Sequence, residues 1–185
     1  IWVTPKGLVV PDEPKGYIMY KVLHLFAGKP LRKDGSKAML RARGIHCDDR
    51  DIEYVTAGLG DCFTHDLRRP EIWDQIEKDI EHDVYSFIVM GPECRTWSRV
   101  RGLGFGPRKL RTLPELWARI GMTYTASEQE ALYWGSYWVV ACARIMKLCY
   151  KNEVGFLYEN PGKVKGLPSA FFTPEMMQIS MMEGL

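Results

Sequence analysis

The sequence predicts an α/β fold whose sheet is mainly parallel and is flanked by helices. Short apolar runs alternate along the chain with longer segments in which apolar residues recur at helical spacing. The apolar runs end at Gly, Pro or acidic residues, which stop strands and begin loops. With 185 residues, 46% of them hydrophobic, the chain is long enough to bury the core of one domain. In sheets of this class, ligands bind beyond the carboxyl ends of the strands.

Local signals place the individual elements. Strands are predicted at 20–26, 45–47, 62–65, 85–90 and 156–158. Helices are predicted at 36–43, 71–80 and 127–151, with a last one from 173. Ser36 can cap the first helix and Gly44 closes it, and Ser127 is paired with Glu130 in a capping box that opens the longest helix. Residues 1–19 are predicted as an N-terminal arm and residues 20–185 as one domain.

The cysteines, the histidines, the apolar runs and the net charge limit which classes of protein this chain can belong to. The five cysteines form no C-x-x-C pair and the four histidines lack paired ligand spacing, so we predict neither a disulfide framework nor a metal site. There is no secretory signal and no apolar run of about 20 residues, which predicts an intracellular protein without a membrane segment and leaves nucleus or cytoplasm open. The formal charge is only +2, so a nucleic-acid surface requires local clustering of basic residues.

The stretch from Tyr85 to Arg101 carries the most specific chemistry. An apolar strand breaks at Gly91-Pro92, and Cys94 follows at once with three arginines close behind it. A thiol that lies just beyond a buried strand and amid positive charge is placed for nucleophilic catalysis. The alternative is that Cys94 is an ordinary small apolar residue in a tight turn.

A second polar motif, Glu159-Asn160-Pro161, follows a short apolar strand. Glu159 would lie beside Cys94 if the two preceding strands are neighbours, as consecutive strands often are. Loss of hydration there would raise the pKa of the Glu159 carboxyl and allow it to donate a proton. The alternative is a plain turn in which Asn160 and Pro161 merely bend the chain.

Three other segments have features of a nucleotide-type ligand site. Leu25 to Gly28 is typical of a glycine turn that lets the backbone approach a ligand. Asp51, followed by Ile52, comes after the second strand, where a carboxylate commonly accepts from ribose hydroxyls. Asp66 follows the predicted third strand and could accept from an adenine amino group. An ordinary turn or a solvated acidic loop remains the alternative for each.

A loop rich in arginine and glycine follows Cys94. From Arg95 to Arg119 it contains seven basic residues and no acid before Glu115. Positive charge, glycine joints and aromatic faces fit a phosphate backbone and unstacked bases, and a solvated loop is the alternative. The residues predicted to contact nucleic acid are Arg95, Trp97, Ser98, Arg99, Arg101, Arg108 and Lys109.

Taken in chain order, these motifs resemble those of the cytosine-5 DNA methyltransferase family over about residues 20–162. Leu25 to Gly28 is similar to the family's first motif, Gly91 to Ser98 to its nucleophile loop, and Tyr158 to Pro161 to its glutamate–asparagine motif. The resemblance implies a Rossmann-like methyltransferase fold that binds S-adenosylmethionine and acts on DNA. It implies cofactor contacts from Phe26, Ala27, Gly28, Asp51, Ile52, Asp66, Leu67 and Pro92.

The resemblance also implies a role for each residue of the catalytic motifs. Cys94 would be the thiolate that adds to carbon 6 of cytosine, which makes carbon 5 nucleophilic enough to accept a methyl group. Glu159 would contact ring nitrogen 3, and Asn160 would orient the loop or the base. The base must be flipped out of the duplex to be reached, which a closing basic loop would assist.

The chain departs from the family pattern in ways that keep two alternatives open. Glu93 stands where the family has a second proline, and its negative charge opposes formation of the neighbouring thiolate. The target-recognition region and the last strands of the sheet have no counterpart here, so we expect a continuation beyond Leu185 or a partner chain to complete the sheet. The alternatives are a catalytically idle nucleic-acid-binding or scaffold domain derived from such an enzyme, and an RNA cytosine methyltransferase.

Overall fold

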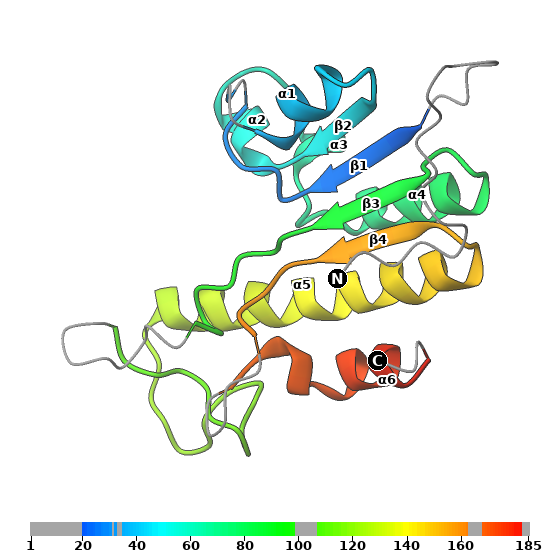
Figure 1. The fold of residues 1–185 in the computed structure, drawn as a ribbon. Coiled ribbons are helices and arrows are strands. Elements are labelled where there is room, and N and C mark those ends of the chain that lie inside the picture. The colour runs from blue at the N-terminus through cyan, green and yellow to red at the C-terminus, as the bar shows by residue number, and fades with distance from the viewer. Residues whose placement is uncertain (1–19, 31, 33–34, 99–106, 163–167, 183–185) are drawn as a thin grey trace. The chain divides into compact units, whose positions relative to one another are not determined.

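The computed structural model describes residues 20–30, 32, 35–98, 107–162 and 168–182, so the predicted arm at 1–19 lies outside the described residues. Four parallel strands form one sheet in the order β2-β1-β3-β4 (Figure 1). The strands are β1 (Lys21–Leu25), β2 (His46–Arg50), β3 (Phe87–Met90) and β4 (Gly155–Tyr158). The predicted α/β class with a parallel sheet flanked by helices is confirmed, and the strand order is compatible with a Rossmann-like fold.

The chain divides into two compact units. The first contains Ile1–Gly91 and Ile145–Tyr158, and the second contains Pro92–Arg144 and Glu159–Leu185. All four strands belong to the first unit, whereas Cys94, Glu159 and Asn160 belong to the second. The predicted single domain over 20–185 stays a prediction, and the units are described separately below.

In the first unit, β1 is a central strand of the sheet and pairs with one strand on each side. It pairs with β2 from Lys21↔His46 to Leu25↔Arg50, and with β3 up to Leu25↔Met90. The chain therefore passes from β1 to β2 on one side and later returns to β3 on the other side. The carboxyl ends of β1 and β3 form a topological switch point, the place where parallel sheets bind ligands.

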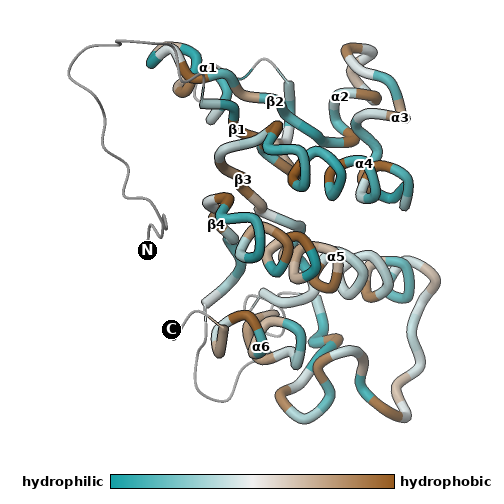
Figure 2. Tube along the Cα trace, turned by 90° about the vertical axis from the view of Figure 1, so that its right-hand side faces the viewer, coloured by the Kyte–Doolittle hydropathy of each residue, from teal (hydrophilic) through white to brown (hydrophobic). Residues whose placement is uncertain are grey.

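Four helices complete the described part of the first unit together with the end of α5. They are α1 (Ser36–Arg41), α2 (Ile52–Thr56), α3 (Cys62–His65) and α4 (Pro70–Glu81). Figure 2 shows α2, α3 and α4 together on one side of the strands. The predicted helix at 71–80 is confirmed as α4, which begins with Pro70 at its first turn and buries Ile72, Trp73, Ile76 and Ile80. Each such side chain contributes about 1.5–3 kcal/mol through burial.

The second unit is built on the first two thirds of the longest helix. This helix is α5 (Ala126–Lys151), and it is followed later by the 3-10 turn η1 (Ala170–Phe172) and by α6 (Pro174–Met182). Residues of α5 up to Arg144 belong to the second unit. Its core includes the side chains of Trp97, Leu110 and Val139, each of which is almost completely buried. None of the described helices is long and apolar enough to cross a membrane.

Four sequence-based predictions about elements are wrong. Ser36 does not cap the first helix, because it is the first residue of α1 and Gly35 is the N-cap, without a side-chain cap. Residues 62–65 form the helix α3 and not a strand, and the Asp61 carbonyl accepts from the backbone N–H of Thr64 at 3.3 Å and of His65 at 3.1 Å. The second strand is longer than expected and includes Asp48 and Asp49, so these acids lie within β2 and not beyond it. The capping box of α5 is formed by Thr125 and Glu128, two residues before the predicted pair.

Candidate active site

A tight turn over residues 94–98, called here the Cys94 turn, follows the end of β3. The carbonyl oxygen of Cys94 accepts hydrogen bonds from the backbone N–H of Trp97 at 2.9 Å and of Ser98 at 2.8 Å. Pro92 is buried ahead of this turn, and the Cys94 side chain is half-buried. The turn therefore fixes the backbone that carries the thiol while leaving the thiol partly accessible.

The surroundings of the Cys94 thiol favour its protonated form. Burial raises the pKa of Cys94 most, and the negative charges of Glu159 and then of Glu93 raise it further. The expected activation by arginine is not seen among the described residues, because Arg95 Nε lies 2.9 Å from Glu93 Oε1 and pairs with that carboxylate. Arg99 and Arg101, the other two arginines of the predicted positive surroundings, lie outside the described residues, so their effect on the thiol stays a prediction.

Glu159 and Asn160 follow β4, the strand that pairs with β3 through Met90↔Tyr158. Glu159 acts electrostatically on Cys94, as expected for residues that follow neighbouring strands. The predicted burial of Glu159 is wrong, because the residue is exposed. Asn160 is only 7% exposed, and within the described chain neither its amide oxygen nor its amide nitrogen has a hydrogen-bond partner. A buried amide without partners is costly and is typical of a residue kept for function.

In the first unit, the turn after β1 has an unusual backbone. Phe26 has a φ of 60° and Gly28 a φ of 73°, both in the left-handed region. For a residue other than glycine, this conformation costs about 1–3 kcal/mol and is enriched at ligand sites. The Phe26 N–H donates to the Arg50 carbonyl at 2.9 Å, and the space beside Gly28 is open, with no atom within 4 Å of an added Cβ. The turn is thus held in shape and left uncovered by the described residues.

Asp51 joins this turn to the next helix. Its Oδ2 accepts from the Gly28 N–H at 2.8 Å, and its Oδ1 accepts from the Glu53 N–H at 2.9 Å as the N-cap of α2. The structure therefore brings together Phe26, Ala27, Gly28, Asp51 and Ile52, which the sequence predicted as cofactor contacts. Each carboxylate oxygen retains a second lone pair that could accept from a ligand hydroxyl.

Asp66 and Leu67 are engaged within the protein. Asp66 accepts from Arg68 Nε at 2.7 Å and from Arg68 Nη2 at 2.8 Å, and these hydrogen bonds hold the pKa of its carboxyl below the usual range. Leu67 is buried, and its carbonyl accepts from the indole N–H of Trp73 at 2.8 Å. Their cofactor role stays a prediction. It was based on a strand at 62–65, and these residues form the helix α3.

The predicted nucleic-acid contacts differ in their availability. Trp97 is 0% exposed, so the prediction that it stacks on a base is wrong. Arg95 pairs with Glu93, and Arg108 donates to Glu128 through Nε at 2.6 Å. Ser98 is half-buried and Lys109 is exposed, and Arg99 and Arg101 lie outside the described residues. Two of the seven basic residues of this loop, Arg95 and Arg108, are therefore balanced by carboxylates.

Sequence reasoning missed the position of Arg111. It is one of the seven basic residues of the predicted basic loop, yet it is 1% exposed and donates hydrogen bonds to the Leu116 and Trp117 carbonyls at 2.7 and 2.9 Å. The only local signal is that Arg111 follows Leu110 in a loop otherwise rich in charge and glycine. That signal is too weak to distinguish a buried arginine from an exposed one.

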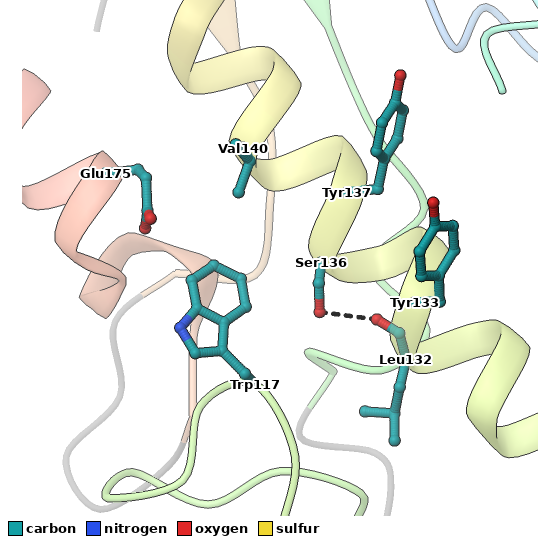
Figure 3. A pocket seen from close by; sticks show the side chains of 7 residues that line it. All are labelled: Trp117, Leu132, Tyr133, Ser136, Tyr137, Val140 and Glu175. Atoms are coloured by element: carbon teal, nitrogen blue, oxygen red, sulfur yellow. Dashed lines mark hydrogen bonds between the residues drawn. The ribbon is translucent and has the colours of Figure 1, made fainter. Parts of the chain in front are cut away.

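An open pocket of about 530 Å³ lies in the second unit, and its lining residue Trp117 packs edge-on against Trp97 with ring centres 6.1 Å apart. Figure 3 shows Trp117 and Glu175 on one side of it, facing Ser136 and Val140 of α5. The Ser136 hydroxyl is already used, since it donates to the Leu132 carbonyl at 2.7 Å. The remaining lining residues are Leu132, Tyr133 and Tyr137. The pocket offers mainly apolar and aromatic contacts, with Glu175, Tyr133 and Tyr137 among its polar groups.

In the second unit, the candidate site therefore consists of the Cys94 thiol, the Glu159 carboxylate that acts on it electrostatically, and the buried amide of Asn160. In the first unit, the corresponding feature is the Phe26–Gly28 turn held by Asp51. Comparisons with protein-family models, with curated proteins and with solved structures find no match to this chain.

Proposed function

We propose that this chain transfers a methyl group from S-adenosylmethionine to carbon 5 of cytosine in DNA, with Cys94 as the nucleophile. The observation that carries the proposal is that Cys94 and Glu159 follow β3 and β4, which are neighbouring strands of a parallel sheet. The negative charge of Glu159 also raises the pKa of the Cys94 thiol. A thiol and a carboxylate at such a position fit a reaction that needs both a nucleophile and a proton-sharing group.

The reaction requires a covalent intermediate because carbon 5 of cytosine is a poor nucleophile. The Cys94 thiol loses its proton, which the Glu159 carboxylate and ring nitrogen 3 can share, and its sulfur forms a bond to carbon 6 while the electron pair of the 5,6 double bond becomes available at carbon 5. S-adenosylmethionine, when bound, would supply the electrophilic methyl group and leave as S-adenosylhomocysteine. Solvent water then takes the proton from carbon 5, the double bond re-forms and the thiolate leaves. Cys94 thus ends the cycle unchanged, as covalent catalysis requires.

Glu159 has a second effect on this chemistry. As a carboxylate it holds the Cys94 pKa above the usual value and so opposes thiolate formation. If its oxygen shares a proton with ring nitrogen 3 of the base, the carboxyl group is neutral and this opposition disappears. Binding of the base would therefore favour loss of the Cys94 proton at the moment when the nucleophile is needed. Asn160, buried beside Glu159, is suited to hold the loop or the base in place.

The first unit supports the proposed cofactor. The Phe26–Gly28 turn lies at the topological switch point of the sheet and is open beside Gly28. Asp51 holds this turn and keeps lone pairs free for ribose hydroxyls. Phe26, Ala27, Gly28, Asp51 and Ile52 are therefore the residues proposed to hold S-adenosylmethionine.

A second candidate is a catalytically idle nucleic-acid-binding or scaffold domain. It is favoured by the raised pKa of Cys94 and by the pairing of Arg95 with Glu93, which leaves this cation less able to stabilise a thiolate. Titration calorimetry with S-adenosylmethionine distinguishes the two candidates. Saturable binding that is lost in Asp51→Ala supports the enzyme, and no heat of binding in the wild-type chain supports the idle domain.

Methyl transfer itself is measured with S-adenosylmethionine carrying a tritiated methyl group, followed by nucleoside analysis of the product. We expect label in 5-methylcytosine with the wild-type chain and none with Cys94→Ser. Cys62→Ser is the matched control, because Cys62 is another half-buried free cysteine. Parallel reactions with duplex DNA and with tRNA decide the acceptor. Methyl transfer that persists in Cys94→Ser would contradict the mechanism.

A further inference from the structure

The Cys94 turn is fastened to α5 through the side chain of Trp97. This side chain is completely buried, and its indole N–H donates to the Gly135 carbonyl of α5 at 3.1 Å. The backbone N–H of the same residue donates to the Cys94 carbonyl at 2.9 Å. Trp97 is therefore the link between the nucleophile and the helix, and whatever fixes the indole also fixes the turn.

A buried arginine fixes that indole. The guanidinium carbon of Arg111 lies 3.9 Å from the centre of a Trp97 ring, in cation–π geometry. The same guanidinium donates to four oxygens: the carbonyls of Leu116, Trp117 and Leu132 at 2.7, 2.9 and 3.1 Å, and the Ser136 hydroxyl at 3.1 Å. A buried charge is tolerated only when it is satisfied in this way, and only the planar five-donor guanidinium can stack and donate in several directions at once.

The helix accepts this close packing because it has a glycine at the contact. A Cβ at Gly135 would lie 2.6 Å from the Thr96 hydroxyl oxygen and 3.3 Å from Arg111 Nη2. Any side chain there would push the Cys94 turn and the guanidinium away from α5. Gly135, Arg111 and Trp97 thus form one packed contact, called here the α5 clamp.

The geometry points to Arg111 as a positioning residue for Cys94, acting through Trp97 within the α5 clamp. Arg111 does not touch the thiol, so its role is to keep the Cys94 turn in place against α5. The thiol is half-buried as a result, and its approach to a base is defined by the turn. The role of the clamp in catalysis rests on the proposed function, whereas its effect on the position of the thiol does not.

The test is site-resolved alkylation of the folded chain by iodoacetamide, with mass spectrometry to follow Cys94 and Cys142 separately. Cys142 is buried in the same unit and reports general opening of that unit. Arg111→Lys keeps the positive charge but loses the planar guanidinium with its several N–H donors. Trp97→Phe keeps an aromatic ring but loses the N–H group that donates to the Gly135 carbonyl. We expect the ratio of Cys94 to Cys142 rates to rise about tenfold in Arg111→Lys, equivalent to about 1.4 kcal/mol.

Trp97→Phe is expected to raise the same ratio, and Arg43→Lys, a change at an exposed arginine of the first unit, is expected to leave it unchanged. An unchanged ratio of Cys94 to Cys142 rates in either clamp variant overturns the inference. This includes the outcome in which both cysteines react faster by the same factor. In the methyl-transfer assay, Arg111→Lys should lower kcat at least tenfold with little change in KM for DNA, and a kcat equal to that of the wild-type chain would count against the clamp. If the wild-type chain transfers no methyl group, the proposed function is wrong. The ratio of alkylation rates still tests whether Arg111 positions Cys94 through Trp97.

Discussion

At the scale of single residues, one thiol and the two carboxylates around it decide whether the candidate site can work. Burial, Glu159 and Glu93 all raise the pKa of Cys94, in that order. In the described chain, Arg95 is paired with Glu93 and does not offset them. In the proposed mechanism, neutralising the Glu159 charge would therefore favour loss of the Cys94 proton. The pH dependence of Cys94 reactivity therefore tests whether these carboxylates act on the thiol.

The alkylation rate of Cys94 is expected to rise with pH through a midpoint above about 8.5, the value for a free cysteine. Glu159→Gln removes a negative charge that disfavours the thiolate, so it should lower this midpoint and speed alkylation at neutral pH. Glu130→Gln, at an exposed position of α5, should leave the midpoint where it is in the wild-type chain. The measurement is the alkylation rate of Cys94 from pH 6 to 10. A midpoint that stays fixed in Glu159→Gln would refute the coupling of these two residues.

Asp51 combines a structural role with a proposed binding role. Asp51→Ala removes the N-cap of α2 and the hydrogen bond to the Gly28 N–H, and we expect a loss of about 1–2 kcal/mol in the free energy of unfolding. It should also weaken binding of S-adenosylmethionine. Asp61→Ala is the matched control, since Asp61 precedes α3 in the same unit and accepts from Thr64. Urea titration and calorimetry measure the two effects, and cofactor binding reduced equally in both variants would deny Asp51 a specific role.

At the scale of elements, the start of α5 depends on contacts from a distant part of the chain. The Glu128 carboxylate accepts from the Thr125 N–H at 2.9 Å and also from Arg108, which is 20 residues earlier. The sequence offers two overlapping capping patterns, Thr125 with Glu128 and Ser127 with Glu130. Because Arg108 holds Glu128, the first pattern prevails, and no local rule could have selected it. The prediction of the helix was right, and its first residue was set by tertiary contact.

Thr125→Ala should destabilise the second unit by about 1 kcal/mol, the usual cost of losing a helix cap. Ser127→Ala changes a residue that already lies inside the helix, so it should be nearly neutral. Urea titrations of the two variants against the wild-type chain provide the comparison. Equal destabilisation by both substitutions would show that the cap is not where the structure has it.

The short elements were the hardest to predict from the sequence. Residues 62–65 contain an apolar and β-favouring pair, Phe63 and Thr64, which a run of four residues cannot assign to a strand or a helix. The backbone turn that begins at Asp61 makes the difference. By contrast, the strands β1, β3 and β4 and the helix α4 were predicted to within about two residues, because their apolar patterns match their burial.

At the scale of the whole molecule, the parallel class and the grouping of Cys94 with Glu159 followed from the order of motifs along the chain. The sequence could not predict the environment of these residues. The burial of Arg111 and Trp97 depends on contacts with α5, which is distant in sequence, and the pairing of Arg95 with Glu93 depends on the conformation of the turn. Within the described residues, β2 and β4 are the edge strands, and completion of the sheet by further chain or by a partner stays a prediction.

The central claim is that Cys94 forms a covalent bond to cytosine during methyl transfer, and a DNA duplex containing 5-fluorocytosine tests it most directly. Fluorine at carbon 5 cannot leave as a proton does, so the sulfur–carbon bond should persist after methyl transfer. We predict a denaturant-resistant complex that forms only with S-adenosylmethionine, carries one added methyl group and maps to Cys94 by peptide mass spectrometry. Absence of this complex with the wild-type chain, or its persistence in Cys94→Ala, would contradict the account.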